Sequence, residues 1–414
     1  MIGIGYLFSK NRSRIRWKTI AWGVLLQFAL GGLVIAWPAG AHALERFSHA
    51  VTGAVAYSDK GSEFVFGWLS QPAIGDAISK ATGVGFGSFI FAFKVMPIVI
   101  FIASFFTILY YLGIMQRVVQ VFAIVMAKLL HLSGAESLAV AANIFIGQTE
   151  APILIAPYIS RMTMSELLTM MTGGMAHISG AVLLAYASMG VPAEYLITAS
   201  VMAAPATIVM AKLLRPEVDE PETAGTVKIS HEKEHANVVE AAAAGASQGM
   251  QLAINIVAML IAFIALISLL NGGLSWVGQY IGFAGPGGAE ADQLSMQWLF
   301  SKVLWPLAWV MGVPAADCGT VARLIGFKTV LNEFVAYVEM TKIAPGAWSD
   351  KARIIASFAL CGFANFSSIA IQIGGIGGLA PNRKSDIARL GGWALLGGSL
   401  ATFMSASIAG ILRG

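Results

Sequence analysis

Six stretches of this chain are apolar over the length that a lipid bilayer demands. A spanning helix needs about 20 predominantly apolar residues, and runs of this length occur at Trp17–Trp37, Phe86–Leu112, Leu167–Met189, Tyr195–Leu214, Gly249–Leu270 and Gly391–Leu412. Only 12% of the residues are charged, whereas soluble domains usually contain about 25%. These features predict an all-α polytopic membrane protein that has the lipid bilayer as a partner.

Basic residues cluster beside two of these apolar runs. The first run is preceded by Lys10, Arg12, Arg14, Arg16 and Lys18, and the last by Arg383, Lys384 and Arg389. Because cytoplasmic loops are enriched in Lys and Arg, both clusters are expected in the cytoplasm, and the net charge of +4 does not indicate a nucleic-acid partner. Met1–Phe8 is apolar but too short to span, so we expect a truncated helix there.

Three further segments are read from their charge patterns. Ala39–Leu69 is amphipathic and is interrupted by Gly and Asp, so we expect a broken stretch that is interfacial or re-entrant. Arg117–Leu130 alternates basic and apolar positions, which is compatible with an interfacial helix. Arg215–His235 carries many charges of both signs and is expected to be a solvated linker that divides the chain near its middle. Asp317 and Arg323 are expected to form a structural ion pair.

Each half of the chain contains one polar tip inside an interrupted apolar stretch. In the first half, Gln148, Thr149 and Glu150 lie between Gly147 and Pro152. Three consecutive residues of an intact helix would spread over about 200°, so some of these groups would face lipid, where a carboxylate is costly. A helix break at the Gly and the Pro avoids this cost, and the sequence therefore predicts a re-entrant hairpin with a protected tip.

The second half repeats this pattern. Its polar tip contains Lys328, Thr329, Asn332 and Glu333, and each tip is followed by a helix with a small-residue break, at residues 171–182 and 361–371. Such an internal repeat with discontinuous helices is typical of secondary transporters. The two tips supply carboxylates, amides and hydroxyls, a set that suits a polar, neutral, hydroxylated ligand with an aromatic face. We see no nucleophile with a base and an orienting group, so catalysis and a bound cofactor are not expected.

Three motifs carry a resemblance to a known family. The sequences GQTEAP at 147–152, NEFVAY at 332–337 and GFANFSSIAI at 362–371 occur in this order in concentrative nucleoside transporters, and the similarity extends over almost the whole chain. The resemblance implies a bacterial inner-membrane symporter that moves nucleosides such as uridine, cytidine and adenosine by alternating access. It also implies a homotrimer in which each protomer has a scaffold domain and a transport domain, the latter with two re-entrant hairpins and two unwound helices.

The resemblance also divides the chain and assigns roles to individual residues. The division is 1–135 for N-terminal helices and interfacial segments, 136–214 for the first transport-domain repeat, 215–248 for the linker, 249–298 for a scaffold helix and loop, 299–378 for the second repeat, and 379–414 for a cytoplasmic loop and the C-terminal helix. By motif position, Gln148, Thr149 and Glu150 face the nucleobase and Val182 and Phe363 form apolar walls. Glu333, Asn365 and Ser368 hold the ribose.

The implied sodium site contains one departure from the family pattern. Asn143 supplies its side chain, Ile146 and Ile178 supply backbone carbonyls, and a hydroxyl residue is expected at position 177, where this chain has His177. Imidazole is a poor ligand for a hard cation, which prefers oxygen, whereas a buried His could carry a proton. The favoured hypothesis is sodium-coupled symport. Proton coupling, transport of a nucleobase or another polar neutral solute, and a channel or intramembrane enzyme are the alternatives.

Overall fold

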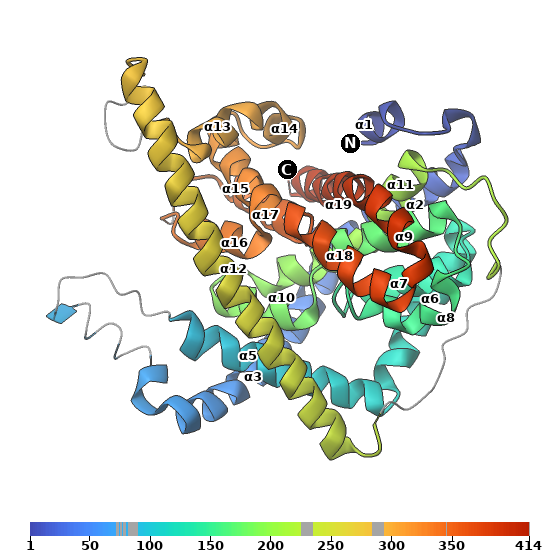
Figure 1. Ribbon diagram of the computed structural model, residues 1–414, viewed down its shortest axis with the longest axis horizontal. Helices are drawn as coiled ribbons and strands as arrows, with labels where there is room; N and C mark the ends of the chain where they lie inside the picture. The colour runs from blue at the N-terminus through green and yellow to red at the C-terminus, as the bar shows by residue number, and fades with distance from the viewer. Residues whose placement is uncertain are drawn as a thin grey trace.

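The computed structural model describes residues 1–71, 90–224, 235–283, 294–344 and 346–413, with a few further positions between 74 and 81. Within these residues the regular structure is helical (Figure 1), apart from one isolated backbone bridge between Ser133 and Ala224. The helical stretches in this part that could cross a membrane are Trp17–Ile35, Ala92–Tyr111, Met164–Ser188, Ala193–Leu214, Val238–Tyr280 and Pro381–Leu412. The all-α polytopic prediction is confirmed; the start of the predicted span Phe86–Leu112 lies outside the described residues.

The N-terminal part consists of α1 (Ile2–Leu7), α2 (Trp17–Gly31) and the long α3 (Pro38–Phe66). The prediction that the segment Ala39–Leu69 is broken was wrong, because α3 is continuous over 29 residues. An internal Gly costs a helix only about 1 kcal/mol, which is too little to break α3. The residues at its two ends determine its length. Pro38 stands in the first helical turn, and Gly67 ends the helix with a φ of 57°, a left-handed conformation that favours glycine.

Two long helices, α5 (Phe91–Tyr111) and α12 (Val238–Tyr280), cross each other beside the repeats. They meet through small residues: a Cβ added at Gly249 would lie 2.7 Å from the Cα of Ile100, so the two backbones approach closely. Lys94 of α5 makes a 2.7 Å ion pair with Asp59 of α3. The side chain of Asp59 is half exposed.

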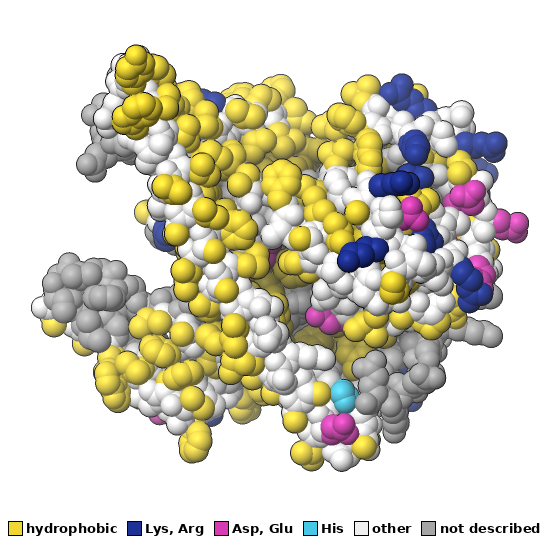
Figure 2. Space-filling model, in the orientation of Figure 1, with side chains coloured by type: hydrophobic (Ala, Val, Ile, Leu, Met, Phe, Trp, Pro, Cys, Tyr) yellow, Lys and Arg dark blue, Asp and Glu magenta, His cyan; other side chains and the backbone are white. Residues whose placement is uncertain are grey.

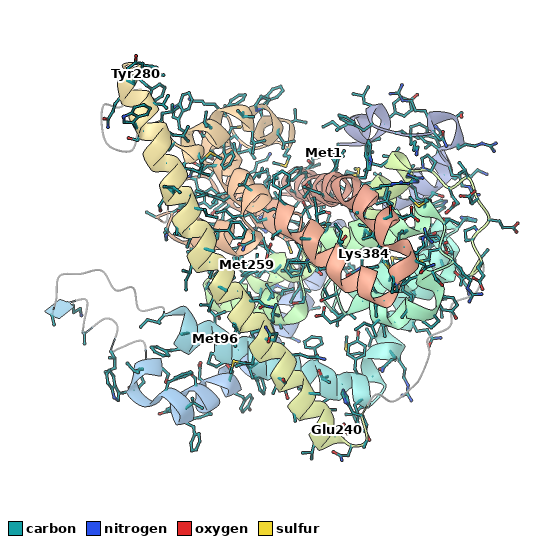
Figure 3. All side chains as sticks on the ribbon, in the orientation of Figure 1. Met1, Met96, Glu240, Met259, Tyr280 and Lys384 are labelled. Atoms are coloured by element: carbon teal, nitrogen blue, oxygen red, sulfur yellow. The ribbon has the colours of Figure 1, made fainter. Side chains whose placement is uncertain are left out.

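Much of α12 has no protein neighbour among the described residues. Only 11% of its most apolar window is buried, and Leu269 and Tyr280 are 72% and 85% exposed. Figure 3 follows the helix from Glu240 through Met259 to Tyr280, and Figure 2 shows apolar side chains along its length while charged side chains gather on the other side of the same view. The outer face of α12 is therefore suited to lipid or to another apolar surface.

The first predicted repeat is present as a hairpin followed by a broken helix. The hairpin descends through α7 (Gly134–Asn143), turns at the polar tip, and returns through a 3-10 segment (Ala151–Ile155) and α8 (Ala156–Ile159). The broken helix consists of α9 (Met164–Ala176) and α10 (Gly180–Ser188). Both hairpin and break occur where the sequence predicts them.

The second repeat has the same order of elements. After α13 (Met296–Val303) and α14 (Trp305–Val310), the hairpin is formed by α15 (Cys318–Val330) and α16 (Glu333–Thr341), and the broken helix by α17 (Asp350–Leu360) and α18 (Phe366–Leu379). The helices α11 (Ala193–Leu214) and α19 (Lys384–Leu412) pack against α9 and α17, so the two broken helices are held side by side (Figure 1).

The beginning of the predicted linker is anchored at two residues, although Val218, Asp219 and Glu220 are exposed. Thr223 accepts a 2.9 Å hydrogen bond from Gly134 N at its carbonyl and a 3.0 Å bond from Ala135 N at its hydroxyl. Glu217 is 7% exposed and pairs with Lys212, which also pairs with Glu136 at 2.7 Å. The segment is therefore clamped to the base of the first hairpin. In addition, α12 already begins at Val238, inside the range 215–248; residues 225–234 lie outside the described part.

The predicted ion pair between Asp317 and Arg323 is also absent from the described residues. Asp317 instead accepts hydrogen bonds from the backbone N and the Oγ of Ser349, at 3.2 and 2.6 Å, and the buried Nε of Arg323 has no partner there. Ser349 also caps α17, so Asp317 fixes the beginning of this helix.

Candidate functional site

The two helix breaks touch each other through their backbones. The N–H of Phe363 donates a 3.1 Å hydrogen bond to the carbonyl of His177. A Cβ at Gly362 would lie 2.8 Å from the carbonyl oxygen of Ala176 and 2.9 Å from that of Met175, so only glycine fits this crossing without displacing backbone. The second half-helices begin with side-chain caps from Ser179 and Asn365, which satisfy N–H groups left free by the breaks.

A buried hydrogen-bond chain joins the first hairpin tip to the second broken helix. Gln148 donates from Nε2 to the Oγ of Ser368 at 3.1 Å, and its Oε1 accepts from Gln372 at 3.2 Å. Gln372 also donates to the carbonyl of Met171 at 2.9 Å. The Oε1 of Gln372 is buried and accepts no hydrogen bond from the described residues. The amides thus line a polar seam between α9, α18 and the tip.

The carboxylate of Glu333 lies at the other end of this seam. It is only 4% exposed. Its Oε1 accepts a 2.8 Å hydrogen bond from the hydroxyl of Tyr186, and its Oε2 accepts a 3.2 Å bond from Nδ2 of Asn365. The ring of Tyr186 packs on Tyr337 with centroids 4.5 Å apart, so the hydroxyl is held in place. One donor on each oxygen uses about half of the acceptor sites of a carboxylate.

The structure therefore unites most of the predicted ligand-binding residues. Gln148, Ser368, Asn365 and Glu333 lie along one connected polar surface, because Asn365 Oδ1 also accepts from Ser368 N at 2.9 Å. Phe363 borders this surface at the helix crossing. Val182, at 2% exposure, lies in the first turn of α10.

Thr149 and Glu150 are oriented differently. Thr149 lies against α18, where a Cβ at Gly375 would be 3.0 Å from its Cγ2, and its hydroxyl donates to Oε1 of Glu150 at 2.9 Å. Glu150 itself is exposed and lines a separate cavity, so in this structure its carboxylate does not contact the Glu333 seam.

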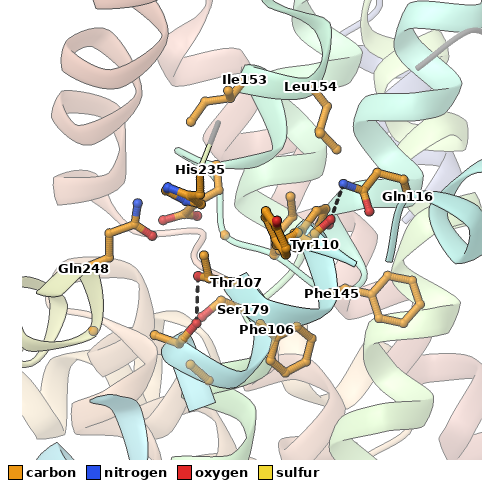
Figure 4. Close-up of a pocket in the computed structure, with 18 of the residues that line it drawn as sticks. Phe106, Thr107, Tyr110, Gln116, Phe145, Ile153, Leu154, Ser179, His235 and Gln248 are labelled. Atoms are coloured by element: carbon orange, nitrogen blue, oxygen red, sulfur yellow. Dashed lines mark hydrogen bonds between the residues drawn. The ribbon is translucent and has the colours of Figure 1, made fainter. Parts of the chain in front are cut away.

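This cavity has a volume of about 650 Å³ and lies between the first hairpin, α5, α6 (Ile114–Leu130) and α12. Figure 4 shows polar groups around it, including Tyr110, Gln116, Gln248 and His235. Gln116 donates to the backbone carbonyl of Tyr110 at 2.6 Å. The cavity thus separates the hairpin tip from the two crossing helices.

Three oxygens around the first break accept no hydrogen bond from the part of the chain that the structure describes. No hydrogen bond from the described residues reaches the side-chain oxygen of Asn143 or the carbonyls of Ile146 and Ile178. The amide of Asn143 donates to the carbonyl of Ala139 at 3.0 Å, which leaves its oxygen for another ligand. His177 is fully buried and turns its Nδ1 to the carbonyl of Gly173 at 2.8 Å, and its Nε2 has no partner in the described part of the chain.

Two residues of the polar seam, Tyr186 and Gln372, were missed by the sequence analysis. Tyr186 sits in an apolar helix, and Gln372 follows the recognised motif by a single residue. Lys328 was assigned to the polar tip, and its side chain is fully buried and donates to Ala359 and Thr402. A buried Tyr or Gln in an apolar helix needs a hydrogen-bond partner, so Tyr186 and Gln372 could have been flagged as polar contacts, although their partners could not have been named.

Comparison with known protein families gives matches along nearly the whole chain. Residues 1–69 match the N-terminal region of the Na⁺-dependent nucleoside transporter family, and residues 195–410 match its C-terminal region. Residues 92–193 match a family named Gate, whose description is nucleoside recognition.

Individual relatives agree with these matches. An uncharacterized transporter of Haemophilus influenzae is 46% identical over 100% of this chain and 96% of its own length. Rat sodium/nucleoside cotransporter 2 is 41% identical over 98% of this chain, which spans 60% of that longer protein.

Solved structures give the same result for the fold. CNTnw in an inward-facing, substrate-bound state is 43% identical, with a TM-score of 0.90 over 100% of this chain and 97% of CNTnw. A CNTnw variant in an outward-facing state gives a TM-score of 0.92 over 100% and 96%.

Proposed function

The chain belongs to the Na⁺-dependent nucleoside transporter family, and from this premise we propose that its nucleoside site is built around Glu333. The protein is a multi-pass membrane transporter that couples nucleoside uptake to sodium by alternating access. The observation that carries the site proposal is the buried Glu333 carboxylate, which retains about half of its acceptor sites.

The free acceptor sites of Glu333 suit a vicinal diol. Two hydroxyls of a ribose can each donate to one carboxylate oxygen, and charge-assisted hydrogen bonds are about twice as strong as neutral ones. Asn365 and Ser368 extend this ribose half of the site. Tyr186 and Asn365 already orient the carboxylate, so little further ordering is needed when the sugar binds.

The nucleobase would lie between the polar seam and the apolar residues beside it. Gln148 and Gln372 present amides, which can both donate and accept, and Val182 and Phe363 supply apolar walls. Gln148 donates a hydrogen bond to Ser368 in this structure. A bound nucleoside would break this bond and form its own hydrogen bonds with both side chains. Thr149 and Glu150 would join the base after the tip rearranges, since Glu150 faces the 650 Å³ cavity here.

The coupling ion is proposed to bind beside the first helix break. Asn143 Oδ1 and the carbonyls of Ile146 and Ile178 are oxygen ligands without protein partners among the described residues, and a hard cation prefers such ligands. The ring of His177 is turned to Gly173, so imidazole need not coordinate the ion. Proton coupling through His177 is the alternative.

Alternating access requires a path on each side of the site. The 650 Å³ cavity is proposed as the inner vestibule, because His235 at the end of the linker lines it and the linker follows the basic residues Lys212 and Arg215.

The exposed apolar face of α12 supports a homotrimer in a bacterial inner membrane, with the crossing helices as the scaffold. Uridine, cytidine and adenosine are the proposed substrates.

The test is uptake of radiolabelled uridine into proteoliposomes under an inward sodium gradient, an inward proton gradient, or neither. Sodium-driven accumulation that unlabelled uridine abolishes, and that uracil and ribose abolish only weakly, is the expected result. Accumulation driven by protons alone would overturn the sodium site and keep the nucleoside site. Competition by uracil as strong as that by uridine would replace the nucleoside with a nucleobase as substrate.

A further inference from the structure

Lys328 is a buried cation held by neutral oxygens. Its side chain is fully buried near the end of α15. The ammonium donates to the carbonyl of Ala359 at 2.7 Å and to the hydroxyl of Thr402 at 3.0 Å, and it lies 5.6 Å from the centre of the Phe403 ring. A lone buried charge is costly. Among the described residues Lys328 makes no ion pair, so the carbonyl of Ala359, the hydroxyl of Thr402 and the ring of Phe403 stabilise this cation.

The pocket stands at a defined place in the second repeat. Ala359 lies in the last turn of α17, immediately before the helix break, and the C-terminal end of a helix attracts cations. Thr402 comes from α19, so the ammonium joins the second hairpin, the second broken helix and the C-terminal helix. Glu333 follows in the same hairpin, and the charges of Lys328 and Glu333 attract each other through space.

The first repeat has a counterpart to this arrangement. There, Asn143 ends the first helix of the hairpin, as Lys328 lies near the end of α15, and Asn143 packs on α9 of the broken helix: a Cβ at Gly173 would lie 3.0 Å from its Nδ2. In both repeats, therefore, the first hairpin helix brings a polar side chain to the last turn before a helix break. In the first repeat that side chain is neutral, and in the second it carries its own positive charge.

We propose that the ammonium of Lys328 is a tethered cation, which fills in the second repeat the position that the coupling sodium takes in the first. It offsets the buried charge of Glu333 and fixes this residue for the ribose. This inference rests on the proposed sodium and nucleoside sites. It implies that only one of the two helix breaks takes a cation from solution, so that sodium activates transport without cooperativity.

The test exchanges the tethered cation for an oxygen ligand. In Lys328→Asn the shorter side chain leaves room for an ion between its own Oδ1, the carbonyl of Ala359 and the hydroxyl of Thr402, which are ligands that sodium accepts. Uridine uptake by this variant should need about tenfold more sodium, and its Hill coefficient for sodium should rise from about 1 towards about 2. Lys328→Met, which offers no ligand, should not transport at any sodium concentration.

A matched control lies on the same hairpin. Lys342, the residue that caps the C-terminal end of α16, is 63% exposed and pairs with Glu339, so Lys342→Asn should keep the uridine KM and the sodium dependence of the original protein. Wild-type transport by Lys328→Met, or an unchanged Hill coefficient and sodium requirement in Lys328→Asn, would overturn the proposal. If the uncharged variants do not fold, Lys328→Arg decides: the retained charge should preserve non-cooperative sodium activation, and a cooperative response would refute the idea.

A measurement without nucleoside separates this inference from the proposed function. The thermal unfolding temperature of detergent-purified Lys328→Asn should rise with sodium and not with equal choline, and the rise should exceed that of the original protein. If the original protein takes up no uridine, the proposed function fails, and this sodium-dependent shift still tests the tethered cation. Equal shifts in both proteins would count against it.

Discussion

The carboxylate of Glu333 is the group whose removal has the most specific expected consequence. In Glu333→Gln the side chain keeps its shape, but it loses its charge and one of its two acceptor oxygens. Two ribose hydroxyls bonded to the carboxylate contribute about 1.5–3 kcal/mol each, because hydrogen bonds to charged groups are worth this much. Loss of one contact, together with weakening of the other to a neutral hydrogen bond, therefore weakens uridine binding by about 2.5–4.5 kcal/mol, or about 10²- to 10³-fold.

A double-mutant cycle with the ligand isolates this contribution. Binding of uridine and of 2′,3′-dideoxyuridine is measured by radioligand competition on the purified original protein and on Glu333→Gln. We expect dideoxyuridine to bind the original protein as weakly as uridine binds the variant, and the variant to distinguish the two ligands by less than about 1 kcal/mol. Glu339→Gln, on the same helix and paired with Lys342, serves as the control that leaves all affinities unchanged.

Glu333 does not bind the diol if Glu333→Gln weakens the binding of both ligands equally. Glu333 also holds Tyr186 and Asn365, so a purely structural carboxylate would lower every affinity by the same factor. Undiminished discrimination against dideoxyuridine in the variant would assign the diol to other residues.

Three further changes probe the supports of the site. Gly362→Ala places a Cβ 2.8 Å from the Ala176 carbonyl, so it should destabilise the fold by about 1–3 kcal/mol; an unchanged thermal unfolding temperature would contradict the tight crossing. Lys212→Met leaves Glu136 and Glu217 buried without their cation and should cost about 3–5 kcal/mol, whereas Arg161→Met breaks an exposed pair worth about 1 kcal/mol or less, a contrast that thermal unfolding measures. His177→Ser adds an oxygen ligand and should lower the sodium concentration for half-maximal uridine uptake; abolished uptake would favour a proton-carrying histidine.

The breaks and hairpins could be predicted because their causes are local. Gly147 and Pro152 enclose the first polar tip, and Gly362 and Asn365 interrupt the last part of the second repeat. Each helix break is therefore determined by a few neighbouring residues.

What could not be predicted depends on contacts between distant residues. Tyr186 and Glu333 are 147 positions apart in the chain, and nothing near Tyr186 indicates a carboxylate. The burial of Glu217 also depends on a contact that its neighbours in the sequence do not indicate. A charge-rich segment is normally solvated, and the ion pair with the buried Lys212 holds Glu217 in place. Glycines and an aspartate inside α3 suggested a break that tertiary context does not impose.

The crossing of the two helix breaks has a consequence for how such a transporter can change over evolution. The contact is made by the carbonyl of His177 and the N–H of Phe363, groups that every residue other than proline supplies. The side chain at position 177 is therefore free to be replaced while the crossing persists. A single substitution at position 177 can therefore change which ion is coupled to transport. The nucleoside-binding residues on the other side of the crossing stay unchanged.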